Sequence, residues 1–155
     1  MTIAAPAEAV WPWVVQIGQE RAGFYSYQFL ENLFGCQIHN ADRIHAEWQD
    51  RRVGDTLRLH PRMPPLRVEQ IEAGRWFVVA SPADSPDGTR VSWLFLVEPL
   101  GPGRSRFLSR YRIRHPSTPV GRLTLGPTLI EPIGFMMDRR MLLGVKARAE
   151  RALRS

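Results

Sequence analysis

Three polar side chains in the first quarter of the chain have the right types for proton transfer. Tyr27 and Glu31 lie four residues apart, which on a helix puts a phenol and a carboxylate on one face. With the imidazole of His39 they could move a proton to or from a carbonyl group of a bound molecule. The commoner alternative is that Glu31 faces water while Tyr27 packs with its hydroxyl at the surface. No catalytic residue is therefore assigned.

A second group combines metal-ligating types at a regular spacing. His39, Asp42 and His45 follow one another by threes, and two imidazoles with a carboxylate are typical zinc or iron ligands. No fourth ligand is suitably spaced, and Asp42 can pair with Arg43 in solvent. The chain also lacks a nucleophile elbow, a phosphate loop, a dinucleotide fingerprint and paired cysteines, and its single Cys36 has apolar neighbours. We expect neither a metal nor another cofactor.

Aromatic side chains could supply a surface for a flat or aliphatic ligand. We expect the aromatic rings of two neighbouring strands and Met137 of the terminal helix to converge on one cavity, with residues 25–48 covering its mouth. For each ring, ordinary core packing is the alternative. The predicted ligand-binding residues are Tyr27, Glu31, His39, Trp48, Trp93, Phe95, Tyr111 and Met137.

The second half of the chain is dominated by alternating segments joined by short turns. We expect an antiparallel meander over residues 55–60, 66–72, 75–80, 90–98 and 104–114. In the last segment one face carries Phe107, Ser109, Tyr111 and Ile113, and the other Arg106, Arg110, Arg112 and Arg114. The first face should look into the core and the second into water.

Helical patterns flank this meander. Residues 5–17 predict a helix with Pro6 near its first turn, and Pro12 should kink it or delay its start. Residues 24–34 predict a second short helix. The tail from residue 130 or 132 to residue 153 predicts a long helix with an apolar stripe formed by Ile133, Met137, Met141, Val145, Ala149 and Ala152. This order indicates one α+β domain over residues 1–155, with a curved antiparallel sheet wrapped around the C-terminal helix and two short helices near the N-terminus.

Several stretches resemble the START-like superfamily of polyketide cyclases, dehydratases and lipid-transport domains. They are residues 3–11 (IAAPAEAVW), 53–55 (VGD), 93–107 (WLFLVEPLGPGRSRF) and 131–132 (EP), while residues 25–27 (YSY) and 38–49 (IHNADRIHAEWQ) look like an uncharacterised bacterial branch. The resemblance implies a helix-grip fold around an internal cavity. The family normally opens with a full strand, and here only residues 1–4 precede the Ala-Pro motif. The resemblance therefore does not predict whether a first strand covers that edge of the sheet.

Composition narrows the choice of partners. The net charge is +6, but almost all of the positive charge is arginine spread along the chain, so we expect no nucleic-acid binding. No stretch is apolar and long enough to insert stably in a membrane, and the start lacks signal-peptide features, which predicts a cytoplasmic protein. We expect a monomer or weak homodimer that binds a small hydrophobic molecule as carrier or sensor. The alternative is a cyclase- or dehydratase-type enzyme using acid–base residues of the same cavity.

Overall fold

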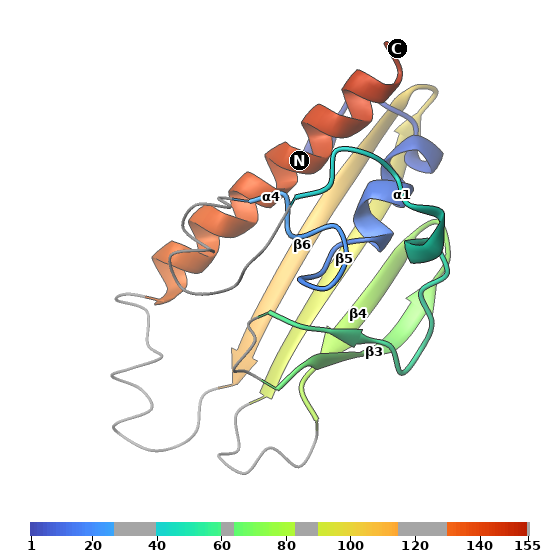
Figure 1. Ribbon diagram of the computed structural model, residues 1–155. Helices are drawn as coiled ribbons and strands as arrows, with labels where there is room; N and C mark the ends of the chain where they lie inside the picture. Colours follow the sequence, from blue (N-terminus) through green and yellow to red (C-terminus); the bar gives the residue numbers. More distant parts are fainter. Residues whose placement is uncertain (27–39, 60–63, 83–89, 115–129, 155) are drawn as a thin grey trace.

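The sheet is a six-stranded antiparallel layer that curls around the helices lying on one of its faces. The computed structural model describes residues 1–26, 40–59, 64–82, 90–114 and 130–154, with side chains of the last range from residue 134 onward. The strands occur in the order β1-β6-β5-β4-β3-β2. Their bounds are β1 (Thr2–Ile3), β2 (Thr56–Leu57), β3 (Leu66–Glu72), β4 (Trp76–Ala80), β5 (Arg90–Gly101) and β6 (Arg104–Arg114) (Figure 1).

The predicted meander is confirmed from β3 to β6, where each strand pairs with the next one in the sequence. β2 is shorter than expected, with only two residues. β1 is also only two residues long, yet it pairs with β6 through Thr2 opposite Arg106 and Ile3 opposite Ser105. The short opening strand is thus enough to cover the β6 edge at that end.

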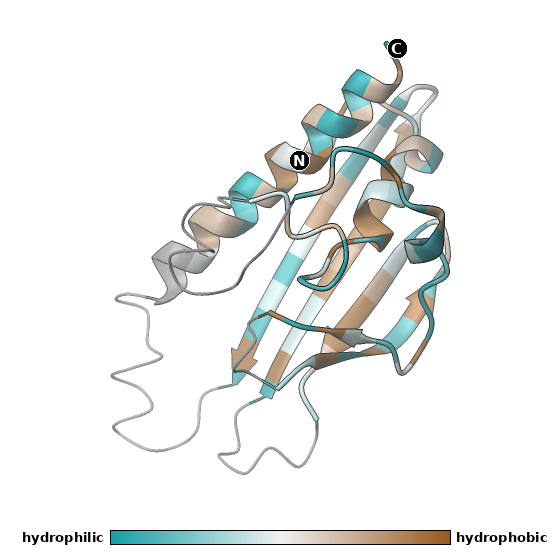
Figure 2. Ribbon diagram, in the orientation of Figure 1, coloured by the Kyte–Doolittle hydropathy of each residue, from teal (hydrophilic) through white to brown (hydrophobic). Residues whose placement is uncertain are grey.

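Alternation along β6 separates the two faces of the sheet as expected. Phe107 is fully buried and Ser109 and Ile113 are half-buried, whereas the four predicted outward arginines are exposed. Tyr111 lies on the inward face but is 44% exposed. Figure 2 shows the same alternation of hydrophobic and hydrophilic residues along the strands. The inward face is therefore closed at Phe107 and open at Tyr111.

The helix α4 (Ile130–Ala152) lies along the inward face of the sheet, as the helix-grip architecture requires (Figure 1). Met141, Val145 and Ala149 of the predicted stripe are buried, whereas Ala152 is exposed. Among the described residues no helix is both long and apolar enough to cross a membrane. The C-terminal half of the stripe thus supplies the helical side of the core.

The helix α1 (Ala7–Val15) covers the same face beside α4 (Figure 1). Its N-cap is Pro6, and it runs on through Pro12, so the expected delay of its start is wrong. Pro12 lacks the N–H that would bond to the preceding turn. The predicted second helix does not begin at residue 24, because residues 24–26 are not helical; residues 27–34 lie outside the described residues.

Tyr25 fixes the distance between this N-terminal segment and α4. Its backbone has a φ of 53°, and its N–H donates to Asn40 Oδ1 at 2.7 Å. Its hydroxyl accepts a hydrogen bond from Gln16 Nε2 at 2.7 Å, and the Arg148 guanidinium lies 4.5 Å from its ring centre. A Cβ at Gly144 of α4 would lie 2.4 Å from the Tyr25 carbonyl oxygen. Only glycine therefore permits this approach.

We predict that Gly144→Ala destabilises the protein by about 1–3 kcal/mol, because the added methyl forces the helix and the Tyr25 backbone apart. Urea unfolding followed by circular dichroism measures the change. Gly134→Ala is the matched control on the same helix, since a Cβ there meets no atom of the described residues within 4 Å. That substitution should be neutral or stabilise by up to about 1 kcal/mol through helix propensity. Equal effects of the two substitutions would contradict the packing argument.

Candidate functional site

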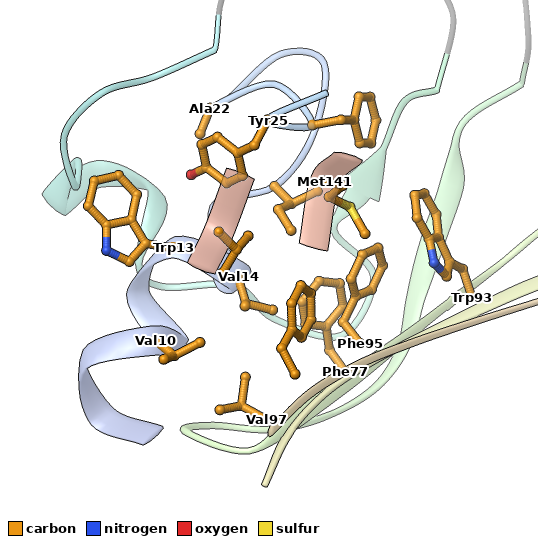
Figure 3. Close-up of a cluster of buried hydrophobic side chains, with 14 of the residues drawn as sticks. Val10, Trp13, Val14, Ala22, Tyr25, Phe77, Trp93, Phe95, Val97 and Met141 are labelled. Atoms are coloured by element: carbon orange, nitrogen blue, oxygen red, sulfur yellow. The ribbon is translucent and has the colours of Figure 1, made fainter. Parts of the chain in front are cut away.

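A row of aromatic rings crosses the inward face of the sheet from β4 to β6. The ring centres are 4.7 Å apart for Phe77 and Phe95, 4.4 Å for Phe95 and Trp93, and 5.6 Å for Trp93 and Tyr111. Figure 3 shows the first three of these rings on the helix side of the sheet, in the cluster that also contains Met141. The structure thus brings together three predicted site residues, Trp93, Phe95 and Tyr111.

The two ends of this row differ in their access to water. Phe95 and Phe77 are fully buried and belong to the packed core. Trp93 is 9% exposed and stacks on Phe24 at 6.1 Å between ring centres, while Tyr111 is 44% exposed. Phe95 therefore supports the site from below, and a ligand could reach the row from the Tyr111 end.

A chain of hydrogen bonds leads from this row to α4. Trp93 Nε1 donates to Ser109 Oγ at 2.7 Å, and Ser109 Oγ donates to the Oδ1 of Asp138. Trp93 and Ser109 share a face because Ser109 lies directly opposite Phe95 on the neighbouring strand. We call Trp93, Ser109, Tyr111 and Asp138 the Asp138 site.

The carboxyl group of Asp138 is the titratable group of this site. Burial raises its pKa, because removal from water disfavours the charged form, and the hydrogen bond from Ser109 opposes part of that shift. A half-buried carboxyl with a raised pKa can accept a hydrogen bond from a ligand or exchange a proton with it. The site thus joins an aromatic surface to one acid–base group.

Met137, another predicted site residue, directly precedes Asp138 on α4 and is half-buried. Its carbonyl oxygen accepts a hydrogen bond from Ser26 Oγ at 3.3 Å, which ties this turn of the helix to the segment that carries Tyr25. The neighbouring Met136 is 52% exposed. Met137 is therefore the more buried of the two methionines and the one adjacent in sequence to Asp138.

Trp48 lies in a different place from the other predicted aromatic residues. It stacks on His45 at 4.1 Å between ring centres and borders a separate hollow of about 330 Å³. Two ion pairs, Arg21–Asp55 and Arg58–Glu20, are formed by residues of its wall. The lining residues are Gly18, Gln19, Glu20, Arg21, Trp48, Asp55, Thr56, Leu57 and Arg58. This hollow is polar and does not extend the aromatic row.

The remaining predicted polar residues, Tyr27, Glu31 and His39, lie outside the described residues. Asp42 and His45 are described, and neither is in a helix. The His45 Nδ1 lies 3.2 Å from a carboxylate oxygen of Glu47. Within the described ranges no three His, Cys, Asp or Glu side chains gather in a group that could hold a metal ion.

Sequence reasoning missed Ser109 and Asp138 as site residues. A signal for Ser109 is present, since it is the polar member of the inward row that also contains Phe107, Tyr111 and Ile113. Asp138 directly follows Met137 of the apolar stripe, so it stands at the border of the buried helix face. These positions could have suggested that Ser109 and Asp138 are both partly buried. They could not have shown that the two side chains form a hydrogen bond with each other.

We predict that Asp138→Asn changes how stability depends on pH. Because the folded-state pKa is raised, the contribution of Asp138 is fully present below its unfolded pKa of about 3.9 and is lost as pH rises through the folded pKa. Asparagine stays neutral and can still accept the Ser109 hydrogen bond. The variant should therefore gain stability relative to the parent protein as pH rises above about 3.9, the unfolded pKa, as measured by urea unfolding at several pH values.

Asp50→Asn is the control for this measurement. Asp50 is exposed, and its hydrogen bond from Arg52 lowers its pKa. The parent protein should therefore become more stable relative to this variant as pH rises. Parallel trends for the two variants would show that the effect at Asp138 does not come from burial.

Comparison with known proteins does not assign the chain to a family. No family model, no curated protein and no solved structure matches it. The resemblance to the START-like superfamily stays a prediction from the motifs, and the function has to be argued from the geometry of the Asp138 site.

Proposed function

We propose that the protein binds a small, mostly hydrophobic molecule beside the Asp138 site and acts as its carrier or sensor. The observation that carries this proposal is the hydrogen-bonded chain from Trp93 through Ser109 to Asp138 on an otherwise aromatic face. Ligand sites of this kind combine apolar walls with a few polar groups that fix the ligand's orientation. Tyr111, at the open end of the row, would be the first ring that a ligand meets.

The chemistry of Asp138 narrows the class of ligand. An ionised carboxylate accepts hydrogen bonds and repels a second carboxylate, and this repulsion is stronger where water is partly excluded. A ligand hydroxyl or ammonium group can donate to Asp138, whereas a ligand carboxylate cannot do so. The favoured ligand is therefore a flat or aliphatic molecule with a hydrogen-bond donor at one end.

This choice gives a prediction with two matched ligands. At a pH high enough to ionise Asp138, a long-chain alcohol should displace an environment-sensitive hydrophobic dye at lower concentration than the fatty acid of equal chain length. The Asp138→Asn variant should lose most of that preference, because its side chain no longer repels the acid. Fluorescence titration measures both displacements, and an unchanged preference in the variant would remove Asp138 from the site.

The location of the site is tested by filling it. Met137→Trp places a bulkier side chain beside Asp138, and we expect dye affinity to fall by about tenfold or more while the protein stays folded. Leu108→Trp is the control, because Leu108 lies on the outer face of the sheet, opposite Leu96 and 39% exposed. Circular dichroism shows whether each variant folds. Equal dye affinity for the Met137→Trp variant and the parent protein would place the ligand elsewhere.

One observation favours a second candidate, an enzyme of the cyclase or dehydratase type. The half-buried Asp138, with its raised pKa, is suited to exchange a proton with a bound substrate. To separate the two functions, the hydroxyl-bearing ligands that bind are incubated with the protein, and mass spectrometry then detects whether they have been converted. Conversion by the parent protein but not by the Asp138→Asn variant would indicate the enzyme, and recovery of unchanged ligand would indicate the carrier.

A further inference from the structure

A second hollow, of about 540 Å³, lies among the end residues of β5 and β6, where the exposed side chains belong to the outer face of the sheet. The cross-strand pairs Arg90–Arg114 and Ser92–Arg112 place these four side chains on one face. It is the face opposite the one that carries the Asp138 site, since Trp93, Ser109 and Tyr111 alternate with them. The lining residues are Glu69, Ala80, Arg90, Val91, Ser92, Arg112, Ile113 and Arg114.

The charges of this hollow are unbalanced. In the part of the chain that the structure describes, three arginines line it together with a single acidic residue, Glu69, and all three arginines are exposed. Arg90 and Arg114 are directly opposite one another, an arrangement in which like charges destabilise the sheet. Among the described residues none of these arginines forms an ion pair with a carboxylate. An anion in the hollow would relieve this repulsion.

The other end of the same two strands shows the contrasting arrangement. There Glu98 lies opposite Arg106, and the two side chains form an ion pair at 3.5 Å. Both pairs are on the outer face and both are exposed. One end of the two strands thus carries the ion pair Glu98–Arg106. The other end carries the two like charges of Arg90 and Arg114, with Arg112 beside them.

We propose that this outer hollow binds a phosphate-bearing anion through Arg90, Arg112 and Arg114. Guanidinium groups bind oxyanions through two parallel N–H donors, and three such groups match the several acceptor oxygens of a phosphate or diphosphate. The Ser92 hydroxyl is a further donor at the same position. The proposal concerns the opposite face of the sheet and does not depend on the ligand proposed for the Asp138 site.

The outer face favours a local anion over a nucleic-acid strand. Beyond the hollow, Leu94 lies opposite Arg110, and Leu96 lies opposite Leu108. Leu108 interrupts the row of arginines along β6, and Leu94 and Leu96 add no charge on β5, whereas a nucleic-acid backbone is bound by a continuous basic track. The cations that can act together are therefore those at the hollow.

The test is calorimetric titration of the full chain with inorganic pyrophosphate at low ionic strength. Arg90→Gln and Arg114→Gln should each weaken binding by about tenfold or more, because each removes a charge-assisted contact. Arg106→Gln, which removes the same charge from the paired end of the strands, should change the affinity by less than about twofold. The thermal midpoints of these variants, measured without anion, show that each one folds.

Two further arms identify the source of the phosphate. Sedimentation with phosphatidylcholine vesicles that contain a phosphatidylinositol phosphate, but not with vesicles that lack it, indicates a lipid headgroup. Binding of pyrophosphate without binding of vesicles indicates a soluble ligand. Either result supports the proposal. It is overturned if neither probe binds, or if Arg106→Gln weakens binding as much as Arg114→Gln does. Salt-sensitive binding of a DNA duplex through Arg90 and Arg114, with no pyrophosphate binding, would overturn it in favour of nucleic acid.

Discussion

At Gly144 the backbone of Tyr25 comes so near to α4 that a Cβ would meet its carbonyl oxygen at 2.4 Å. This contact fixes how closely the long helix can approach the N-terminal segment. The segment is held in turn by the hydrogen bond between Gln16 and the Tyr25 hydroxyl and by the bond from the Tyr25 N–H to Asn40. Asp138 lies six residues before Gly144, about 9 Å along the helix axis, so its reach to Ser109 depends on this packing.

The fixed position of α4 explains why the inward face has a closed part and an open part. Met141 and Val145, on either side of Gly144, are buried against the sheet. At Asp138, nearer the N-terminal end of α4, the helix meets the sheet through a polar contact with Ser109. The aromatic row thereby remains accessible at Tyr111. A polar anchor at the border of an apolar surface is the physical basis of the proposed ligand site.

The two faces of β5 and β6 have separate chemistry because alternate residues point in opposite directions. Trp93 and Ser109 serve the inward face, while Arg90 and Arg114 meet on the outer one. Substitutions on one face should therefore leave binding at the other unchanged. The inner site selects an apolar molecule with a hydrogen-bond donor, and the outer hollow selects an oxyanion. The same pair of strands thus positions both proposed sites.

The sequence by itself determined the strands from residue 66 onward, the long terminal helix and the two faces of β6, because these follow from local periods of 2 and 3.6 residues. It also identified Trp93, Phe95 and Tyr111 as neighbours. Only the tertiary structure decided that Ser109 bonds to Asp138, 29 positions away, and that Trp48 borders a different hollow. It alone decided that Arg90 lies opposite Arg114, since pairing depends on strand register. Residue periods fix the direction of a side chain, but which side chains meet depends on how the elements pack.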